Sequence, residues 1–255
     1  MAGARVWVTG ASTGIGAALA RELADRGARV AISARRADLL HEVAGGRMHV
    51  EPCDVTDRSA VLAAGAAVRT ALGGIDVVVL NAGTWSQFRV EEWDSASFAE
   101  HLQVNLMGTV HALEAVVPTM IAQRRGTIVG VASVAGFRGI PGSESYGATK
   151  AALIHLLEAL RGSLAPRGVV VQTVNPGFVR TPMTDRNEFG MPFIVSAEEA
   201  ARAIVAGLEK GKAEIVFPFP MMLVMKTVRL LPVRVWTVVT SGLARRNLRR
   251  ERRRR

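Results

Sequence analysis

The fold is decided by a stretch near the N-terminus, Arg5-Val-Trp-Val-Thr9-Gly10-Ala-Ser-Thr-Gly14-Ile-Gly16. The apolar run Ala4–Thr9 is typical of a short buried strand, and apolar residues then recur at helical spacing from Ala17 to Ala24. A strand, a glycine-rich turn and a helix in this order form an anion site, because glycine lets the backbone approach a phosphate and the helix N-terminus offers unpaired N–H groups. A second strand-like run, Arg29–Ser33, follows. We therefore expect an α/β sheet that begins with a phosphate-binding turn.

The composition fits one α/β domain. The chain has 255 residues, of which 49% are hydrophobic, and this is enough for a sizeable core around one large sheet. Cys53 is the only cysteine, which excludes an internal disulfide framework. Because the strand-like run begins at Arg5, there is no room for a signal peptide, and we expect a cytoplasmic protein.

The net charge of +10 is concentrated at the C-terminus. Residues 226–255 hold 11 Lys and Arg and one acid, a net of +10, whereas residues 1–225 hold 21 Lys and Arg and 21 acids, a net of zero. The body is therefore neutral, and the total charge gives no support for specific nucleic-acid binding by the folded domain.

Further strands and helices alternate along the rest of the chain. Apolar runs predict five more strands: Met48–Pro52, Ile75–Leu80, Gly126–Val131, Val169–Val174 and Glu214–Phe217. Helical patterns lie between them, over Arg58–Leu72 and Ser95–Gln123, after Tyr146, and after the expected N-cap Ser196. Alternation of this kind predicts, over residues 1–220, a single doubly wound Rossmann-type parallel sheet of about seven strands with helices on both faces.

A tyrosine and a lysine stand one helical turn apart in Gly142-Ser-Glu-Ser-Tyr146-Gly-Ala-Thr-Lys150. Residues at i and i+4 share a helix face, so the ammonium of Lys150 would lower the phenol pKa from its usual value of about 10. This arrangement suits an acid/base group that works near neutral pH. A surface Tyr and Lys at a helix start is the alternative, but Tyr146 is the only tyrosine in the chain.

Several motifs, in a fixed order, resemble the short-chain dehydrogenase/reductase family. They are Thr9-Gly10-x-x-x-Gly14-x-Gly16, Asn81-Ala82-Gly83, a serine (Ser133) thirteen residues before Tyr146, and Tyr146-x-x-x-Lys150. The resemblance covers about residues 4–217 and implies an oxidoreductase that interconverts a hydroxyl and a carbonyl with a nicotinamide cofactor. A nucleotide-binding sensor or scaffold without turnover is the alternative, and the intact catalytic set argues against it.

The resemblance assigns the chemistry to Asn105, Ser133, Tyr146 and Lys150. Tyr146 would exchange a proton with the substrate oxygen, and Ser133 would hydrogen-bond the same oxygen. Lys150 would lower the Tyr146 pKa and bind the nicotinamide ribose, while Asn105 would hold a water that links Lys150 to solvent. No metal is expected, because the five histidines show no ligand spacing.

The resemblance also implies a set of cofactor contacts. Asp54 would lie at the adenine ring with Val55 beside it, and Asn81 would pin neighbouring strands while Ala82 and Gly83 leave room for the cofactor. The other expected contacts come from the glycine-rich turn, from the catalytic pair and from the loop after the sixth strand: Gly10, Ser12, Thr13, Gly14, Ile15, Gly16, Tyr146, Lys150, Pro176, Gly177, Val179 and Thr181.

The end of the second strand favours NADP(H) over NAD(H). The sequence there is Ser33-Ala-Arg35-Arg36, with no carboxylate before Asp38 to bind the ribose hydroxyls. Arginine presents a planar fork of donors that fits a 2′-phosphate. Solvated arginines at a helix start are the alternative, and because Thr13 stands where some NADP-dependent relatives carry a basic residue, the preference depends on Arg35 and Arg36 alone.

The expected substrate is a hydrophobic alcohol or ketone. Apolar side chains dominate the candidate pocket and the lid between Thr181 and Ser196: Trp85, Phe88, Phe137, Ile140, Phe178, Met183, Phe189, Met191 and Phe193. Many of these would equally pack the lid on the body, and Arg138 would either meet an anionic group or be solvated. The resemblance implies a homodimer or homotetramer.

After residue 220 the chain leaves the family pattern. Residues 221–243 predict an amphipathic helix, bent or split at Pro232, and residues 244–255 predict an arginine-rich, disordered tail. On one helical wheel the charges share an arc with two threonines (Lys226, Arg229, Arg234, Thr237 and Thr240), opposite Val224, Val228, Leu231, Val235, Trp236, Val238 and Val239. This pattern suits peripheral contact of residues 221–255 with the anionic inner face of a membrane. A helix that closes the pocket, or packs between subunits ahead of a solubilising tail, is the alternative.

Overall fold

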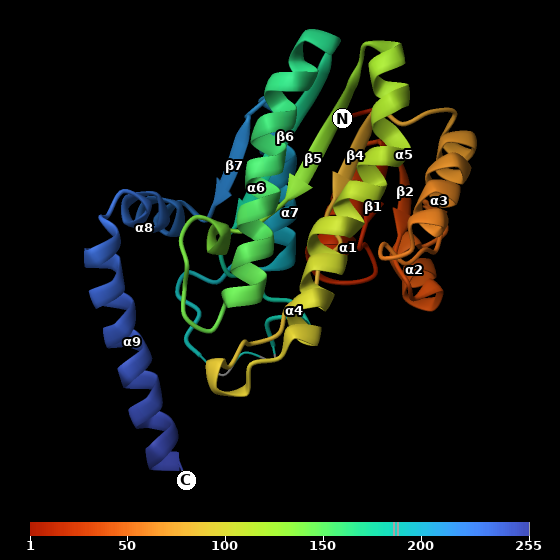
Figure 1. The fold of residues 1–255 in the computed structure, drawn as a ribbon. Helices are drawn as coiled ribbons and strands as arrows, with labels where there is room; N and C mark the ends of the chain where they lie inside the picture. Colours follow the sequence, from red (N-terminus) through yellow and green to blue (C-terminus); the bar gives the residue numbers. More distant parts are fainter. Residues whose placement is uncertain (186, 188, 255) are drawn as a thin grey trace.

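A seven-stranded parallel sheet forms the centre of the molecule, with strand order β3-β2-β1-β4-β5-β6-β7 (Figure 1). The computed structural model describes residues 1–185, 187 and 189–254, and only the backbone of Leu243 and residues 246–254. The strands are β1 (Arg5–Thr9), β2 (Arg29–Ser33), β3 (His49–Val50), β4 (Val77–Leu80), β5 (Gly126–Val131), β6 (Val169–Pro176) and β7 (Glu214–Phe217). The helices are α1 (Gly14–Asp25), α2 (Ala37–Ala44), α3 (Arg58–Leu72), α4 (Ser95–His101), α5 (Gly108–Gln123), α6 (Glu144–Leu164), α7 (Ala197–Glu209), α8 (Phe219–Arg229) and α9 (Val233–Arg254).

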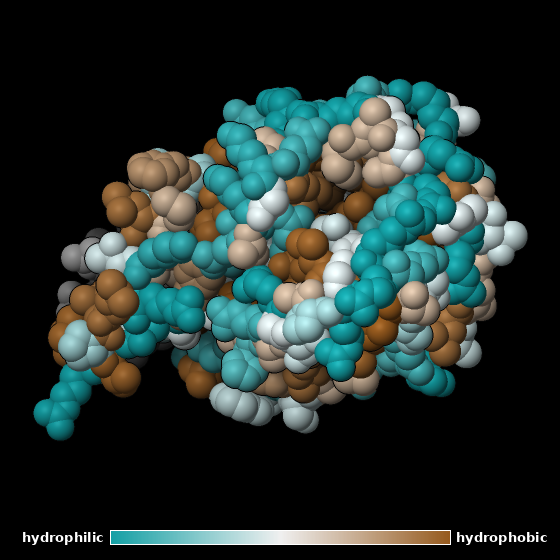
Figure 2. Space-filling view, turned by 90° about the horizontal axis from the view of Figure 1, so that it is seen from above, coloured by the Kyte–Doolittle hydropathy of each residue, from teal (hydrophilic) through white to brown (hydrophobic). Residues whose placement is uncertain are grey.

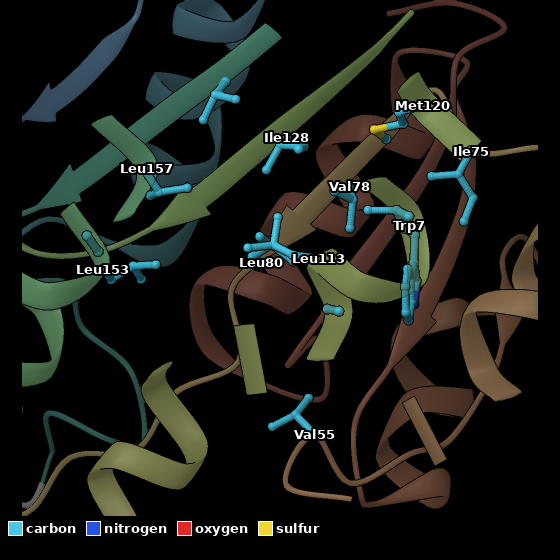
Figure 3. Close-up of a cluster of buried hydrophobic side chains, with 14 of the residues drawn as sticks. Trp7, Val55, Ile75, Val78, Leu80, Leu113, Met120, Ile128, Leu153 and Leu157 are labelled. Atoms are coloured by element: carbon cyan, nitrogen blue, oxygen red, sulfur yellow. The ribbon is translucent and has the colours of Figure 1, made fainter. Parts of the chain in front are cut away.

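Each face of the sheet has its own hydrophobic core, because side chains alternate across a strand. On β1, Trp7 enters the core under α3, α5 and α6, whereas Val6 and Val8 enter the core under α1, α2 and α7. Figure 3 shows the first core, with Trp7 beside Val78. The buried indole of Trp7 donates a hydrogen bond of 2.9 Å to Ser33 Oγ, so this polar group is not left unpaired. The predicted doubly wound sheet is confirmed.

The sheet reverses its strand order beside β1. This strand pairs with β2 on one side and with β4 on the other. Strands β2 and β3 are added on one side of β1, and the later strands β4 to β7 are added on the other side, with all strands parallel. In open α/β sheets, ligands bind at the carboxyl ends of strands where the order reverses. The fold therefore directs the search for a site to the ends of β1 and β4.

Strand ends differ from the sequence prediction where a strand gains or lacks a neighbour. The third strand is only His49–Val50 instead of Met48–Pro52, because it lies at the sheet edge and Pro52 has no N–H to donate. The sixth strand continues to Pro176, because β7 pairs with it as far as Phe217. The bounds of β2, α3, β5 and β7 agree with the prediction.

The predicted single helix Ser95–Gln123 is interrupted by a π-helical segment, Leu102–Met107. The extra residue in a π-turn changes the helix face, and here it accompanies the complete burial of Asn105. Among the described residues, Ser95–Gln123 is also the one helix long and apolar enough to cross a membrane, but 44% of its most apolar window is buried. Side chains such as Val116 and Met120 belong to the core, so this segment is a core helix.

The C-terminal segment forms two helices. Pro232 separates α8 from α9, as predicted. The arginine-rich stretch expected to be disordered is instead the end of α9, which continues to Arg254. Arginine is a good helix former and is favoured near a helix C-terminus, and this is why a run of arginines prolongs the helix.

Candidate active site

A cleft of about 300 Å³ opens at the carboxyl ends of the central strands. It is lined by nineteen of the twenty-one residues that the sequence assigned to catalysis or cofactor binding; Gly16 and Asn105 lie outside its lining. The nineteen are Gly10, Ser12, Thr13, Gly14, Ile15, Arg35, Arg36, Asp54, Val55, Asn81, Ala82, Gly83, Ser133, Tyr146, Lys150, Pro176, Gly177, Val179 and Thr181. Residues from seven separate segments therefore meet at one site.

The glycine-rich turn requires glycine at two positions of the cleft floor. Gly10 has φ +66°, and a Cβ there would lie 2.5 Å from the Cα of Ala82. Gly14 has φ +59°, and a Cβ there would lie 3.0 Å from Cγ2 of Thr181. Residues other than glycine rarely adopt such φ angles, and an added Cβ would overlap the Ala82 backbone at Gly10 and press on the Thr181 side chain at Gly14. The turn thus exposes backbone at the N-terminus of α1, as an anion site requires.

Asn81 holds the turn against the end of β4. Its Nδ2 donates to the carbonyl oxygens of Thr9 (3.1 Å) and Gly10 (3.0 Å), and its backbone N–H donates to Thr9 Oγ1 (3.1 Å). A Cβ on Gly16 would lie 2.4 Å from the Gly10 oxygen and 2.5 Å from Asn81 Nδ2. The structure therefore gives Gly16 a packing role behind the cleft, where the sequence had suggested a cofactor contact.

Two arginines stand at the rim of the cleft, directly after β2. Arg35 and Arg36 are both exposed, and Arg36 Nη2 donates to Ser12 Oγ at 3.4 Å. On the next loop, Asp54 Oδ1 accepts hydrogen bonds of 2.9 Å from the N–H and the hydroxyl of Thr56. The rim near β2 is therefore cationic, while the Asp54 carboxylate already has partners.

Tyr146, Lys150 and Ser133 lie together at the other end of the cleft. Lys150 Nζ lies 5.5 Å from the centre of the Tyr146 ring and donates a 2.9 Å hydrogen bond to the Val131 oxygen. Ser133 Oγ accepts from the Ala135 N–H at 3.1 Å and donates to the Pro176 oxygen at 3.5 Å, and the Ser133 side chain lowers the pKa of Tyr146. This group can exchange a proton with a bound oxygen atom.

Burial decides the pKa values of the catalytic pair. It raises the pKa of Tyr146 to about 12, against the smaller lowering effect of Ser133, although part of the side chain stays open to the cleft. Burial also lowers the pKa of Lys150 to about 8. The prediction that Lys150 brings the Tyr146 pKa below 10 is wrong for this geometry. The ammonium donates its hydrogen bond to the Val131 oxygen, and desolvation opposes the charged form of both groups.

Asn105 connects the loop after β4 to α6. Its Oδ1 accepts from the Thr84 N–H at 2.7 Å, and its Nδ2 donates to the Thr84 oxygen (3.1 Å) and to Thr149 Oγ1 (3.0 Å). A Cβ on Gly83 would lie 3.3 Å from Asn105 Oδ1 and 3.6 Å from Lys150 Nζ. Asn105 is thus fully buried behind the cleft, and Gly83 keeps the space between its amide and Lys150 free of a side chain.

The sequence reasoning missed several residues of the cleft. Most of them are sequence neighbours of predicted cleft residues at strand ends, and this adjacency could have identified them. Nothing in the sequence indicated Glu100 on α4 or Val104 in the π-helical segment. The missed lining residues are Ala34, Cys53, Thr84, Glu100, Val104, Val131, Ala132 and Thr184. Burial raises the pKa of the Cys53 thiol to about 11, so it is unreactive at neutral pH.

Of the nine apolar side chains proposed for the substrate pocket, only Met183 is among the residues that line the cleft. Phe88 and Phe137 are buried elsewhere in the protein. Trp85 stands beside the catalytic tyrosine, with ring centres 5.1 Å apart, and its Nε1 donates a 2.8 Å hydrogen bond to Asn187 in the lid. The lid is thus joined to the Tyr146 side of the cleft. The side chain of Arg138 donates to the Leu231 oxygen at 2.8 Å instead of pointing to the cleft.

Within the described part of the chain, no group of three His, Cys, Asp or Glu side chains is placed to hold a metal ion. The polar groups of the cleft are backbone amides, hydroxyls, one amide side chain and cations, with the carboxylates of Asp54 and Glu100 on separate segments. This donor set is suited to phosphate groups and to a neutral oxygen atom.

Comparison with known sequences identifies the family. A model of the short chain dehydrogenase family matches residues 4–190. This chain belongs to that family. A Myxococcus xanthus protein described as an uncharacterized oxidoreductase is 37% identical over 231 residues, which cover 88% of this chain and 91% of that protein. This short-chain dehydrogenase is therefore an oxidoreductase with an NAD(P)-binding fold, from a family that is typically oligomeric and acts on small molecules.

Solved structures show the same fold. A short chain dehydrogenase from Burkholderia cenocepacia in complex with NADP is 29% identical, with a TM-score of 0.80, over 91% of this chain and 99% of that one. A family member from Burkholderia phymatum in complex with NAD has a TM-score of 0.81 over 88% of this chain and 92% of that one. At 24% identity, the second likeness concerns the fold alone. Both NAD and NADP are bound by proteins with this fold, so the cofactor preference of this chain depends on the residues of its own cleft.

Proposed function

We propose that this short-chain dehydrogenase is an NADP(H)-dependent oxidoreductase that interconverts a carbonyl and a hydroxyl group on an apolar small molecule, with Tyr146 as the acid/base. The observation that carries the proposal is the meeting of Tyr146, Ser133 and Lys150 in one cleft with the glycine-rich turn and the Arg35–Arg36 pair. A binding protein without turnover would need the turn and the arginines, but not the catalytic group.

The cleft fits a nicotinamide dinucleotide. The side-chain-free backbone at Gly10 and Gly14 and the N-terminus of α1 would hold the pyrophosphate. Asp54 and Val55 would flank the adenine, while Val179 and Thr181 would contact the nicotinamide amide. Arg35 and Arg36, exposed at the rim, would bind the 2′-phosphate. When bound, this cofactor supplies or accepts the hydride.

The protein handles the proton. With its pKa raised to about 12, Tyr146 stays protonated at neutral pH and can donate to the substrate oxygen during carbonyl reduction. Ser133 Oγ hydrogen-bonds the same oxygen and stabilises the negative charge that develops on it. Lys150, cationic below its pKa of about 8, adds electrostatic stabilisation and holds the ribose. Asn105 fixes the loop at Thr84, and with water it returns the proton from solvent.

Apolar groups near the catalytic tyrosine support a hydrophobic substrate. Trp85 stands against Tyr146 with ring centres 5.1 Å apart, and Met183 lines the same cleft. Purified enzyme with NADPH and a panel of aliphatic, aromatic and polyol carbonyl compounds tests this. We expect oxidation of NADPH with apolar ketones or aldehydes, followed at 340 nm; activity confined to polyols or charged carbonyls would reject the substrate class.

Arg35 is the test of the cofactor preference. Arg35→Asp replaces the phosphate-binding fork with a carboxylate that repels a phosphate, so NADPH affinity falls by at least about tenfold, while NADH affinity is kept or improved. Arg29→Asp, an exposed arginine at the start of the same strand, is the matched control and leaves both affinities unchanged. Equal NADPH affinity in wild type and Arg35→Asp would show that Arg35 does not select the cofactor.

A homodimer or homotetramer is the proposed assembly. The helical layer that carries Asn105 leaves Leu102 and Met107 exposed. Exposed apolar side chains of this kind suit a surface that a second subunit covers. Sedimentation velocity of the wild type and of Met107→Glu measures this, and a wild-type monomer would contradict it.

A further inference from the structure

Exposed apolar side chains are concentrated on the C-terminal helices. Of the sixteen large apolar side chains that are exposed in the described structure, eight lie between Phe219 and Val239. These eight are Phe219, Leu223, Val224, Leu230, Val233, Val235, Val238 and Val239. Figure 2 shows the corresponding hydrophobic surface on the left of the molecule, where Figure 1 places α8 and the start of α9. Single exposed apolar residues are ordinary, whereas a group of eight on two helices marks an interaction surface.

Helix α8 turns part of its charged side toward the body. Lys226 Nζ pairs with Glu214 on β7 at 2.7 Å, and the Arg229 guanidinium lies 5.7 Å from the centre of the Phe137 ring. Met221 and Met225 anchor the same helix in the core. Both charged side chains stay exposed beside these contacts. Because these contacts attach α8 to the body, its apolar residues are left on the outside.

The outward residues of α8 form one line. Phe219, Leu223 and Leu230 are separated by four and seven residues, so they share one face of the helix. Their exposed fractions are 69%, 58% and 84%. The most exposed of them, Leu230, directly follows the last residue of α8 and leads into α9.

Helix α9 continues this apolar surface. Trp236 Nε1 donates a 2.7 Å hydrogen bond to the Gly139 oxygen, and Thr240, four residues on, is buried. Val235, Val238 and Val239 therefore face away from the body, and Val238 is 73% exposed. The break at Pro232 explains why one wheel for the whole segment failed: it rotates α9 relative to α8, so that Thr240 lies inside and the valines lie outside.

Positive charge follows the apolar surface along the chain. Residues 226–255 carry the whole net charge of +10, and eight arginines stand between Arg245 and Arg255. An occupant must therefore combine an apolar interior with a negative surface. A second copy of the chain would bring the same positive charge to the contact, and a nucleic acid would leave eight apolar side chains in water.

We propose that α8 and α9 dock this protein on an anionic lipid bilayer. The exposed apolar side chains enter the boundary between headgroups and acyl chains, and the arginines that follow bind the negative surface. The same helices contact the loop after Ser133, through Arg138 to Leu231 and Gly139 to Trp236. Docking would thus bring the bilayer beside the catalytic cleft, so that an apolar substrate could enter the cleft from the membrane. Only this delivery of substrate depends on the proposed function.

Vesicle flotation of the full-length protein tests the docking. Vesicles of phosphatidylcholine, with or without phosphatidylglycerol, are mixed with wild type, with an apolar variant (Leu230→Gln with Val238→Gln) and with a charge variant (Arg249→Gln, Arg250→Gln, Arg252→Gln and Arg253→Gln). A matched control carries Val90→Gln with Val170→Gln, two exposed apolar residues outside the C-terminal helices. Unchanged thermal melting shows that each variant is folded.

We expect wild type and the matched control to float with phosphatidylglycerol vesicles, and the partition coefficient to fall at least about tenfold in both the apolar and the charge variants. Wild type that stays at the bottom of the gradient would overturn the proposal. So would an apolar variant that floats like wild type, because the arginines alone would then bind anions such as lipid or RNA. An apolar variant with unchanged flotation but an altered sedimentation coefficient would assign the surface to a second copy instead. None of these flotation results tests the proposed enzyme activity, because NADPH oxidation is measured without vesicles.

Discussion

Replacing Lys150 with methionine should stabilise the protein while abolishing most of its activity. Lys150 is 3% exposed, and burial lowers its pKa from 10.5 to about 8. Its one hydrogen-bond acceptor in the described structure is the Val131 oxygen. A catalytic group that is kept charged in a buried position is expected to cost stability, and the size of that cost follows from the pKa shift.

The pKa of Lys150 is lowered by about 2.5 units. At about 1.4 kcal/mol per unit, keeping Lys150 charged at pH 7 lowers the stability of the folded state by about 3 kcal/mol. Methionine has similar length and no charge, so it removes this cost. Loss of the hydrogen bond to Val131 offsets about 1 kcal/mol. The expected net gain in the free energy of unfolding is about 2 kcal/mol, which raises Tm by roughly 4–8 °C in a protein of this size.

Urea unfolding as a function of pH checks the sign. The unfolded chain keeps the Lys150 proton up to pH 10.5, whereas the folded chain releases it near pH 8, so wild-type stability relative to Lys150→Met rises with pH over this window. The difference between the two proteins is therefore largest at or below pH 7 and shrinks toward pH 10.5. Lys210→Met, at an exposed lysine, is the control and shows no such dependence. A variant less stable than wild type at pH 7, or a difference that does not change with pH, would refute the reasoning.

Two further substitutions test the packing behind the cleft. Gly136→Ala places a Cβ 2.7 Å from the Lys150 carbonyl carbon and 2.8 Å from the Ala151 nitrogen, so thermal unfolding should report a loss of stability of about 1–3 kcal/mol. Gly139→Ala is the control and should be neutral, because no atom lies within 4 Å of its Cβ; equal stability of the two variants would contradict the close packing at Gly136. Asn105→Leu leaves the Thr84 N–H without its acceptor, so we expect the free energy of unfolding to fall by about 1–3 kcal/mol and kcat to fall as well. Asn105→Asp keeps an acceptor for this N–H and should retain more of the stability. Equal losses of stability in the two variants would mean that the Thr84 contact is unimportant.

Most strands were predictable because they are short apolar runs, and those at the centre of the sheet are buried on both faces. The limits of β5 and β7 follow directly from such runs, and the capping box at Ser196, where the Glu199 side chain bonds back to the Ser196 N–H, was visible as a serine before acids. The motif glycines and Asn81 were found because they match the motifs of the short-chain dehydrogenase family. Sequence reasoning therefore recovered the fold and most of the cleft lining.

What remained hidden depends on contacts between distant segments. Glu100 on α4 and Val104 in the π-helical segment Leu102–Met107 reach the cleft, and no periodicity in the sequence indicates the π-helical segment. The direction of the Tyr146 pKa shift depends on burial, which sequence spacing does not reveal, so spacing alone gave the wrong sign. The orientation of α8 is set by the Lys226–Glu214 pair, whose partner stands on β7.

The central claim is that Tyr146 transfers the proton in an NADP(H)-dependent reaction. Tyr146→Phe keeps the ring, including its contact with Trp85, and removes only the hydroxyl. The most direct measurement compares NADPH affinity, by fluorescence titration, with kcat for the best ketone of the panel in the same preparations of wild type and Tyr146→Phe. We predict unchanged NADPH affinity and a kcat lower by about 10²- to 10⁴-fold, the usual contribution of a general acid. Equal turnover in the two proteins would contradict the account.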